Sequence, residues 1–366
     1  MSKKTALIVG ASGVIGQAAA ERFAKSGFDR VIGLSRRPPD LPPELDVEHL
    51  AIDLLDEEAC ANAASELGDL THLVYAALFE KPGLVAGWHE ADQMQTNLAM
   101  MRNLMEPLLS SATKLSHVSA LQGTKAYGAH VHEISVPARE SQARDPHANF
   151  YWLQEDYLRE KRAGAPWSLT IWRPQVVFGT ATGAAMNIIP VLGAYAAIQR
   201  TLGRPLTYPG RPGGVAEAVS AELVADALFW ASDAVEAADQ IFNITNGDVF
   251  TWQGVWPAIA RALKMEPAYG EPFSLADYLL QHADVWDDVV EKYGLRPQSL
   301  KELVGESHHY ADLLFGVEAP ADAARAPVLV STIKLRQAGF GACEDTEKMF
   351  ARLLDEVAVL GIVPSP

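Results

Sequence analysis

The amino-terminal half of the chain alternates short apolar runs with stretches whose apolar residues recur every three or four positions. Runs of this length predict buried strands, and the three-to-four spacing predicts amphipathic helices. Strands are predicted at residues 5–9, 30–35, 47–52, 71–77, 114–119 and 168–173, and helices at 14–25, 56–67, 94–109 and 149–161. Because strands and helices alternate, we predict an α/β fold with a Rossmann-type, doubly wound parallel sheet. Such sheets bind ligands at the carboxyl ends of their strands.

The pattern becomes mixed in the carboxyl-terminal half. Helices are predicted at 186–202 and 221–231, a proline- and glycine-rich turn at 205–214, a last strand at 240–245 and an aromatic helix start at 250–256. We therefore expect a core over residues 1–180 and a mixed region over residues 181–366. The mixed region should return to the sheet at about 215–250 and otherwise form a smaller, mostly helical lobe, one wall of a substrate cleft. Its large aromatic residues either form the lobe core, which we favour, or contact a ligand; they are Trp252, Trp256, Tyr278 and Trp286.

Three glycines interrupt the chain where the first strand should end and the first helix begin. They are Gly10, Gly13 and Gly16, spaced as G-x-x-G-x-x-G. A glycine turn between a parallel strand and a helix lets the backbone approach a pyrophosphate, with the helix amides directed at its charge. The alternative is a tight turn without a ligand. The βαβ context favours a dinucleotide site.

The end of the second predicted strand indicates which dinucleotide binds. An NAD site places an acidic residue there, but this strand ends in Ser35, Arg36 and Arg37. Two guanidinium groups and a hydroxyl suit a 2′-phosphate. We therefore predict NADPH, against the alternative of a solvated basic turn. At the end of the third strand, Asp53 either reaches the adenine amino group or caps the helix predicted from Asp56 to Leu67.

Composition and charge exclude several classes of partner. The 366 residues carry 30 basic and 46 acidic side chains, a formal net charge of -16. This balance argues against binding to nucleic acid or to an anionic membrane surface. The two distant cysteines, Cys60 and Cys343, and the apparent lack of a signal peptide predict a cytoplasmic protein. The histidines show no ligand spacing, so we predict no metal site.

A tyrosine can act as the acid in a reductase when a nearby cation stabilises its charged form. Tyr151 lies on the helix after the fifth strand, where ordinary short-chain dehydrogenases carry Y-x-x-x-K. One turn later this chain has Glu155 instead of lysine, so the cation must come from elsewhere if the site is active. Lys125, in the long unpatterned stretch from 120 to 148, is the candidate. A solvated loop lysine is the alternative.

Residues 149–156 read N-F-Y-W-L-Q-E-D. This segment resembles the N-F-Y-Y-x-x-E-D motif of the progesterone 5β-reductase and iridoid synthase-like family of atypical extended short-chain dehydrogenases/reductases. The resemblance covers most of the chain, through 10–16, 36–37, 53–54, 121–127, 173–174, 246–252 and 331–340. Two features depart from the family pattern. Trp152 replaces the second tyrosine, and the segment between Gln122 and Lys125 is one residue shorter.

The resemblance implies that Tyr151 and Lys125 are the catalytic pair and that NADPH reduces the C=C bond of an enone or enal. Hydride would add to the β-carbon while Tyr151, polarised by Lys125, stabilises the enolate oxygen. The expected cofactor-binding residues are Gly10, Ser12, Gly13, Val14, Ile15, Gly16, Ser35, Arg36, Arg37, Asp53, Leu54, Ala77, Gln122, Tyr151, Val177 and Met186. The expected partner is a small-molecule substrate, and a homodimer is left open.

Two further polar residues keep alternative interpretations. Ser119 either assists catalysis or is a strand-end hydroxyl, and Asn97 either holds a water in a helix or is surface. The competing functions are an NADPH-dependent carbonyl reductase or epimerase-like enzyme, and a non-catalytic NADP-binding sensor or scaffold. The missing Y-x-x-x-K argues against an ordinary epimerase. The presence of both Tyr151 and Lys125 argues against a sensor.

Overall fold

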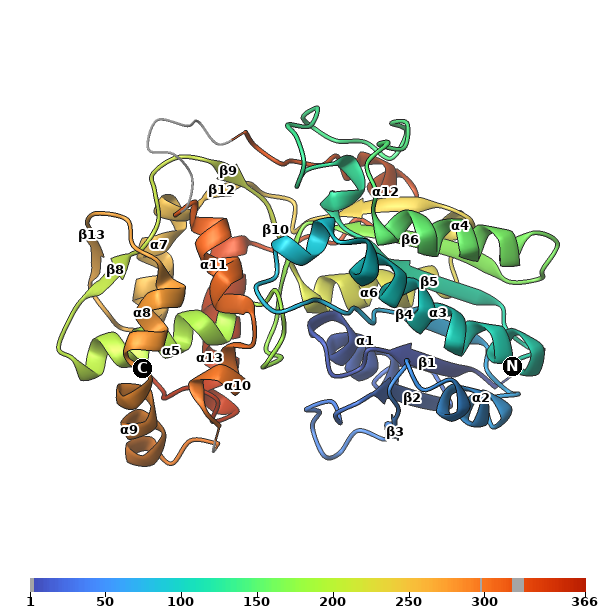
Figure 1. Cartoon of the computed structure of the whole chain (residues 1–366), viewed down its shortest axis with the longest axis horizontal. Coiled ribbons are helices and arrows are strands. Elements are labelled where there is room, and N and C mark those ends of the chain that lie inside the picture. The colour runs from blue at the N-terminus through green and yellow to red at the C-terminus, as the bar shows by residue number, and fades with distance from the viewer. Residues whose placement is uncertain (1–2, 297, 318–325) are drawn as a thin grey trace.

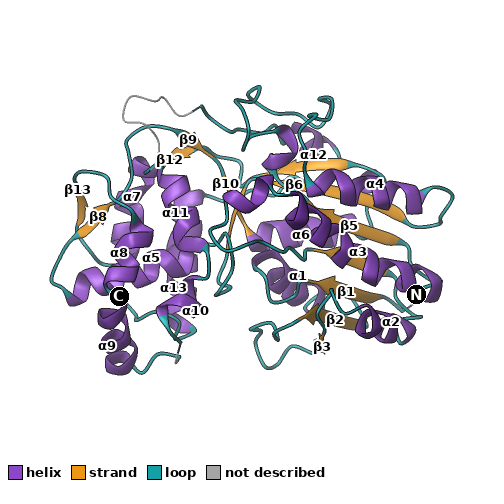
Figure 2. Ribbon diagram, in the orientation of Figure 1, coloured by secondary structure: helices purple, strands orange, loops and turns teal. Residues whose placement is uncertain are grey.

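The computed structural model describes residues 3–296, 298–317 and 326–366. Within these ranges seven parallel strands form one sheet, in the order β11-β6-β5-β4-β1-β2-β3 (Figures 1 and 2). Their bounds are β1 Thr5–Val9, β2 Arg30–Ser35, β3 Glu48–Ala51, β4 His72–Tyr75, β5 His117–Leu121, β6 Ser168–Pro174 and β11 Ile241–Ile244. The order steps outward from β1 in both directions, which is the doubly wound arrangement. The predicted fold class is confirmed.

The two faces of the sheet are covered by different helices. Alternate residues of β1 show this, because Leu7 and Val9 face one layer and Ala6 and Ile8 the other. The first layer consists of α2 (Glu57–Ser65), α3 (Ala91–Ser111) and α4 (Phe150–Arg162), and the second of α1 (Val14–Ala24), α6 (Ala221–Ala231) and α12 (Ile333–Gln337). The six strands other than the edge strand β3 are therefore buried on both faces, which explains their mostly apolar sequences, whereas β3 is partly exposed.

A helical lobe lies beside the carboxyl ends of the strands (Figure 1). Its helices are α5 Ile189–Thr201, α7 Trp252–Ala262, α8 Leu275–Gln281, α9 Ala283–Tyr293, α10 Leu300–Val304, α11 Ser307–Phe315 and α13 Thr346–Val359. They share one apolar core that contains Trp252, Trp256 and Trp286, all nearly inaccessible, and Tyr278 packs against it. The core interpretation of these aromatic residues is confirmed.

Three short strand pairs of the described residues lie outside the main sheet, all beyond β6 along the chain. They are β7 Val176–Phe178 with β10 Ala218–Ser220, β8 Leu206–Tyr208 with β13 Pro267–Tyr269, and β9 Val215–Ala216 with β12 Phe250–Thr251. Between residues 215 and 250, α6 packs on one face of the sheet and β11 pairs with β6. None of the helices in the described ranges is both long and apolar enough to cross a membrane.

The helix predicted from residue 186 begins later than expected, at Ile189. The side chain of Asn187 donates to the carbonyl oxygens of Gly179 and Ala181, both at 2.8 Å, and so holds the preceding residues in a loop. Pro190 follows in the first turn, where its missing N–H costs nothing. The apolar pattern continues through this loop because the loop is itself buried, and periodicity alone could not locate the boundary.

Candidate active site

The glycine turn after β1 is too crowded for side chains. Gly10 has φ +84°, and a Cβ built on it would lie 2.7 Å from the backbone nitrogen of Ala77, which follows β4. A Cβ on Gly16 would lie 2.0 Å from the Gly10 carbonyl oxygen. Gly13 precedes the first residue of α1 and offers no side-chain cap. The first-turn amides of α1 are thus left for a ligand, which is the form of a pyrophosphate cradle.

The arginine pair stands at the end of β2 with its charges available. Arg36 and Arg37 are exposed, and neither forms an ion pair with any residue that the structure describes. The Ser35 hydroxyl donates to the carbonyl oxygen of Arg37 at 2.6 Å and so shapes this turn. A Cβ on Gly183 would lie 3.1 Å from Nη1 of Arg37. The guanidinium group therefore reaches toward the loop that precedes α5.

The structure rules out one of the two roles predicted for Asp53, because it shows which residue caps α2. Asp56, not Asp53, caps α2, because its carboxylate accepts from the backbone N–H of Ala59 at 2.9 Å. Asp53 is exposed, and among the described residues its carboxylate accepts only from the N–H of Leu55, at 3.0 Å. The capping interpretation of Asp53 was wrong, and its contact with adenine stays a prediction.

The remaining predicted cofactor residues lie near the glycine turn or on the loop beyond it. Ala77 touches Gly10, as described above. Val177 lies in β7. Gly179, just after β7, lies against the start of α1, since a Cβ built on it would be 3.0 Å from Cγ1 of Val14. Met186 lies in the loop before α5, half-buried. Their contacts with a cofactor stay predictions.

Tyr151 lies in the first turn of α4, near the carboxyl ends of the parallel strands. Its backbone N–H donates to the side chain of Asn149, the predicted cap, at 3.0 Å. The hydroxyl oxygen faces the lysine loop, since a Cβ on Gly123 would lie 3.3 Å from it. Burial raises the pKa of Tyr151, and the charge of Glu80 raises it further. The phenol therefore keeps its proton and is suited to donate a hydrogen bond.

Lys125 lies beside Tyr151 despite the shortened loop. It sits in a short 3-10 helix, η2 (Thr124–Tyr127), and its Nζ is 6.0 Å from the centre of the Tyr151 ring. Among the described residues, the side chains of Lys125 and Tyr151 make no direct hydrogen bond with each other. The amide of Asn149 donates to the carbonyl oxygen of Lys125 at 3.2 Å. One residue thus fixes both the tyrosine helix and the lysine loop.

Glu155, at the position where ordinary short-chain dehydrogenases carry lysine, belongs to a buried polar network. It accepts from Nε2 of Gln122 and from Nε of Arg159, both at 2.8 Å. Arg173 donates to Oε1 of Gln122 at 2.9 Å and lies 3.9 Å from the Glu155 carboxylate. These arginines balance the charge of Glu155. Both the nitrogen and the oxygen of the Gln122 side-chain amide are engaged in this network, and its predicted cofactor contact remains untested.

Two residues have roles that neither sequence interpretation anticipated. Ser119 lies inside β5 and is inaccessible; its hydroxyl accepts from Trp172 Nε1 at 3.1 Å and lies 3.0 Å from His117 Nε2. Asn97 is 1% exposed, and its side chain accepts from the N–H of Phe79 and donates to its C=O, both at 2.9 Å. Ser119 is thus committed to the sheet interior, and Asn97 is buried, so the surface interpretation of Asn97 was wrong.

Sequence reasoning missed two neighbours of the lysine and a third residue that contacts one of them. Glu80 lies 3.4 Å from the lysine Nζ, the ring centre of Trp88 lies 4.1 Å from it, and Gln93 donates to Glu80 at 2.6 Å. All three belong to the connection after β4 or to the start of α3. This part of the sequence carries no strand or helix periodicity up to residue 90, so no signal marked Glu80 or Trp88.

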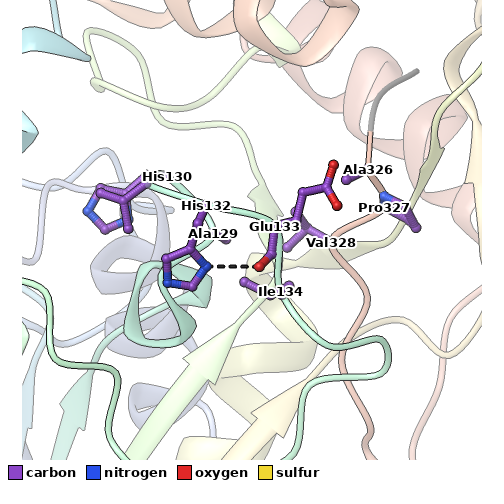
Figure 3. Close-up of a pocket in the computed structure, with 9 residues that line it drawn as sticks. Ala129, His130, His132, Glu133, Ile134, Ala326, Pro327 and Val328 are labelled. Atoms are coloured by element: carbon purple, nitrogen blue, oxygen red, sulfur yellow. Dashed lines mark hydrogen bonds between the residues drawn. The ribbon is translucent and has the colours of Figure 1, made fainter. Parts of the chain in front are cut away.

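A separate hollow of about 300 Å³ lies behind the lysine loop. The segments 129–134 and 326–328 line it (Figure 3). Its link to the candidate site is His130, whose ring centre is 6.2 Å from that of Trp88. None of the predicted site residues lines this hollow, so the chemistry is better assigned to the strand ends.

Comparison with known proteins places the chain in a family. Residues 6–245 match the model of the NAD dependent epimerase/dehydratase family. An (S)-8-oxocitronellyl enol synthase of Catharanthus roseus is 30% identical over 380 residues, covering 99% of this chain and 93% of that protein. A 3-oxo-Delta(4,5)-steroid 5-beta-reductase of Arabidopsis thaliana is 29% identical over 381 residues, covering 99% and 94%.

Solved structures agree with the fold. The UDP-glucose 4-epimerase of Thermotoga maritima, solved with UDP-glucose, has a TM-score of 0.66 at 15% identity and covers 96% of this chain and 97% of its own. The UDP-glucose 4-epimerase of Thermus thermophilus, solved with NAD, has a TM-score of 0.66 at 18% identity and covers 96% and 98%. The chain is an oxidoreductase of the NAD dependent epimerase/dehydratase family and belongs to its progesterone 5β-reductase and iridoid synthase-like branch.

Proposed function

We propose that the protein uses NADPH to reduce the C=C bond of activated enones or enals. The observation that carries this proposal is the pairing of Lys125 with Tyr151 at the strand ends, its Nζ 6.0 Å from the tyrosine ring centre. This pairing supplies the cation that the helix lacks, since the helix position holds Glu155. The enol synthase and steroid 5-beta-reductase relatives support the same reaction class.

The choice of NADPH rests on Arg36 and Arg37. Both guanidinium groups are exposed at the end of β2 and have no carboxylate partner among the described residues. Two free guanidinium groups at this place suit the 2′-phosphate of NADPH, through charge-assisted hydrogen bonds. The crowded glycine turn fits the pyrophosphate, because its backbone alone can line the cradle.

The chain's own residues then have distinct tasks. When bound, NADPH supplies the hydride. The Tyr151 hydroxyl donates a hydrogen bond to the substrate carbonyl oxygen, where negative charge develops as the β-carbon accepts the hydride. The positive charge of Lys125, beside Tyr151, stabilises the negative charge on that oxygen. The resulting enolate takes a proton from water at its α-carbon, which gives the saturated product. The position of the β-carbon against the nicotinamide decides between C=C and C=O reduction.

We assign the substrate cleft to the space between the core, residues 1–180, and the lobe within residues 181–366. Both cysteines are free thiols, which agrees with a reducing compartment such as the cytoplasm.

Turnover of 2-cyclohexen-1-one tests the proposal. We expect NADPH oxidation with a saturated ketone as product, identified by mass spectrometry and NMR. Tyr151→Phe removes the hydrogen-bond donor and should lower kcat by about 10²- to 10³-fold. Lys125→Met should lower kcat while NADPH still binds. An allylic alcohol would assign the protein to the carbonyl reductases, and tight NADPH binding with no turnover of any enone would support the sensor function.

A further inference from the structure

A buried carboxylate faces the lysine of the candidate site. The side chain of Glu80 is 3% exposed, and its Oε1 lies 3.4 Å from Nζ of Lys125. Its other oxygen accepts from Nε2 of Gln93 at 2.6 Å. A carboxylate so removed from water requires compensation, and here a cation and an amide provide it.

The backbone around Glu80 is fixed by two amides that lie one turn apart on α3. Asn97 holds the N–H and the C=O of Phe79, and Gln93 accepts from the N–H of Lys81 at 2.9 Å. Gln93 and Asn97 are each 1% exposed. The residues on both sides of Glu80 are therefore anchored to the interior face of one helix.

The same helix is linked to the helix of the tyrosine. Gln154 of α4 donates to the carbonyl oxygen of Asn97 at 3.0 Å. Through α3, this contact fixes the position of the connection that carries Glu80 relative to α4, the helix that carries Tyr151. Glu80 is thus placed with respect to both members of the pair.

The lysine has little else to balance its charge. Three aromatic rings surround its Nζ, those of Trp88 at 4.1 Å, Phe150 at 5.9 Å and Tyr151 at 6.0 Å. Ring faces attract a cation, but less strongly than water solvates one. In the described part of the chain, Glu80 is the only carboxylate in ion-pair contact with Lys125.

We propose that Glu80 is the positioning residue of the candidate site, which keeps Lys125 charged and its ammonium group against Tyr151. This inference rests on the proposed function. Glu80 does not touch the substrate in this account; it acts through the lysine.

The titratable groups that face Lys125 set the direction of the expected effect. They are Glu80 from the connection after β4, Tyr151 from α4 and His130 from the loop after η2. Burial lowers the pKa of Lys125, and the charge of Glu80 opposes that decrease. Burial lowers the pKa of His130 to about 4, so this ring is neutral where the enzyme is assayed and does not contribute to the alkaline limb.

The first test is the pH dependence of kcat in Glu80→Gln. Loss of the carboxylate should lower the pKa of Lys125, so the alkaline limb of kcat should move to lower pH by roughly one unit or more. The Kd of NADPH should change less than about twofold. The control is Glu90→Gln, at a half-exposed glutamate of the same connection that pairs with Lys81 away from the site. An unmoved limb in Glu80→Gln would overturn the proposal.

A second measurement does not depend on turnover. Competitive labelling with an amine reagent over a pH series, followed by mass spectrometry of the Lys125 peptide, reports the protonation of this lysine. The midpoint should fall in Glu80→Gln, fall less in Glu80→Asp, which keeps a more distant charge, and stay unchanged in Glu90→Gln. If Glu80→Gln does not fold, an unchanged midpoint in Glu80→Asp contradicts the proposal.

The two readouts separate this inference from the proposed function. Enone reduction with an unshifted Lys125 midpoint would leave the function intact and reject the role of Glu80. A shifted midpoint without reduction of any enone would retain the Glu80–Lys125 pair and reject the proposed reaction.

Discussion

In the proposed mechanism, Tyr151 and Lys125 divide the task that a single helix carrying both a tyrosine and a lysine performs in ordinary short-chain dehydrogenases. Burial keeps Tyr151 protonated, so the phenol is a donor rather than a base. The lysine approaches from η2 instead of from the same helix, and Asn149 joins the two through its contacts with both backbones. The helix position of the missing lysine is then free to hold Glu155, which stabilises the packing of Gln122 and Arg173.

At the same scale, the arginine pair should decide cofactor preference. In Arg36→Ser/Arg37→Ser we expect the Kd of NADPH to rise about 10- to 100-fold, because two charge-assisted contacts to the 2′-phosphate are lost. The Kd of NADH, which lacks that phosphate, should change less than about threefold. Fluorescence titration with both cofactors measures this. Arg261→Ser, at an exposed arginine of α7, is the control. Equal loss of both cofactors would reject the phosphate contact.

At the scale of elements, α3 fixes the backbone of the connection after β4 through the side chains of Gln93 and Asn97. Its buried amides bind a backbone segment that belongs to neither helix nor strand, and without Asn97 the part-buried N–H and C=O of Phe79 would lose these hydrogen bonds. This explains why two polar residues occupy the interior face of an otherwise apolar helix. Packing and site geometry depend on the same bonds.

Asn97→Ala should therefore be costly. We expect the free energy of unfolding to fall by about 2–4 kcal/mol, because a buried side chain is lost and the two part-buried backbone groups of Phe79 lose their hydrogen bonds to it. Urea denaturation measures the change. Gln95→Ala, at an exposed position of the same helix, should stay within about 0.5 kcal/mol of the native value. A loss as small for Asn97→Ala as for Gln95→Ala would show that α3 does not hold this connection.

A second element-scale feature is the carboxylate of Glu217, between β9 and β10. It accepts from the N–H of Val330 at 2.8 Å and has no cationic partner among the described residues. Burial raises its pKa to about 7, from a usual value of 4.5. Between these values the folded chain retains a proton that the unfolded chain releases, so stability falls as the pH rises from 4.5 to 7 and is level above.

Glu217→Gln should remove this dependence. The amide stays neutral, and its oxygen can still accept from Val330. Relative to the native chain, the variant should gain about 1–3 kcal/mol in free energy of unfolding between pH 5 and pH 8, measured by urea denaturation. Glu271→Gln, at an exposed glutamate, should follow the native curve. A constant difference between Glu217→Gln and the native chain at the two pH values would refute a raised pKa.

At the scale of the whole molecule, the sheet and its flanking helices were predictable because each element carries its own signal. Short apolar runs gave β1 and β2 with their observed limits, and the cap at Asn149 located α4. The helices beyond residue 256 were not predicted individually. They bury their apolar faces against one another, and contacts such as Trp286 Nε1 to the carbonyl oxygen of Gln298 depend on the assembled lobe.

The candidate site follows the same division. Tyr151 and Lys125 were found because each lies in a local motif. Glu80 was not found, because it is 45 residues from Lys125 in a connection without periodicity, and only the fold brings the two together. A residue whose role is electrostatic support of another residue leaves no local pattern.

The destination of the hydride tests the central claim most directly. The enzyme would turn over 2-cyclohexen-1-one with NADPH deuterated at nicotinamide C4 on the transferred face, and NMR would locate the label in the product. We predict a saturated ketone with deuterium on the carbon β to the carbonyl. Deuterium on the carbinol carbon of an allylic alcohol would contradict conjugate reduction at this site.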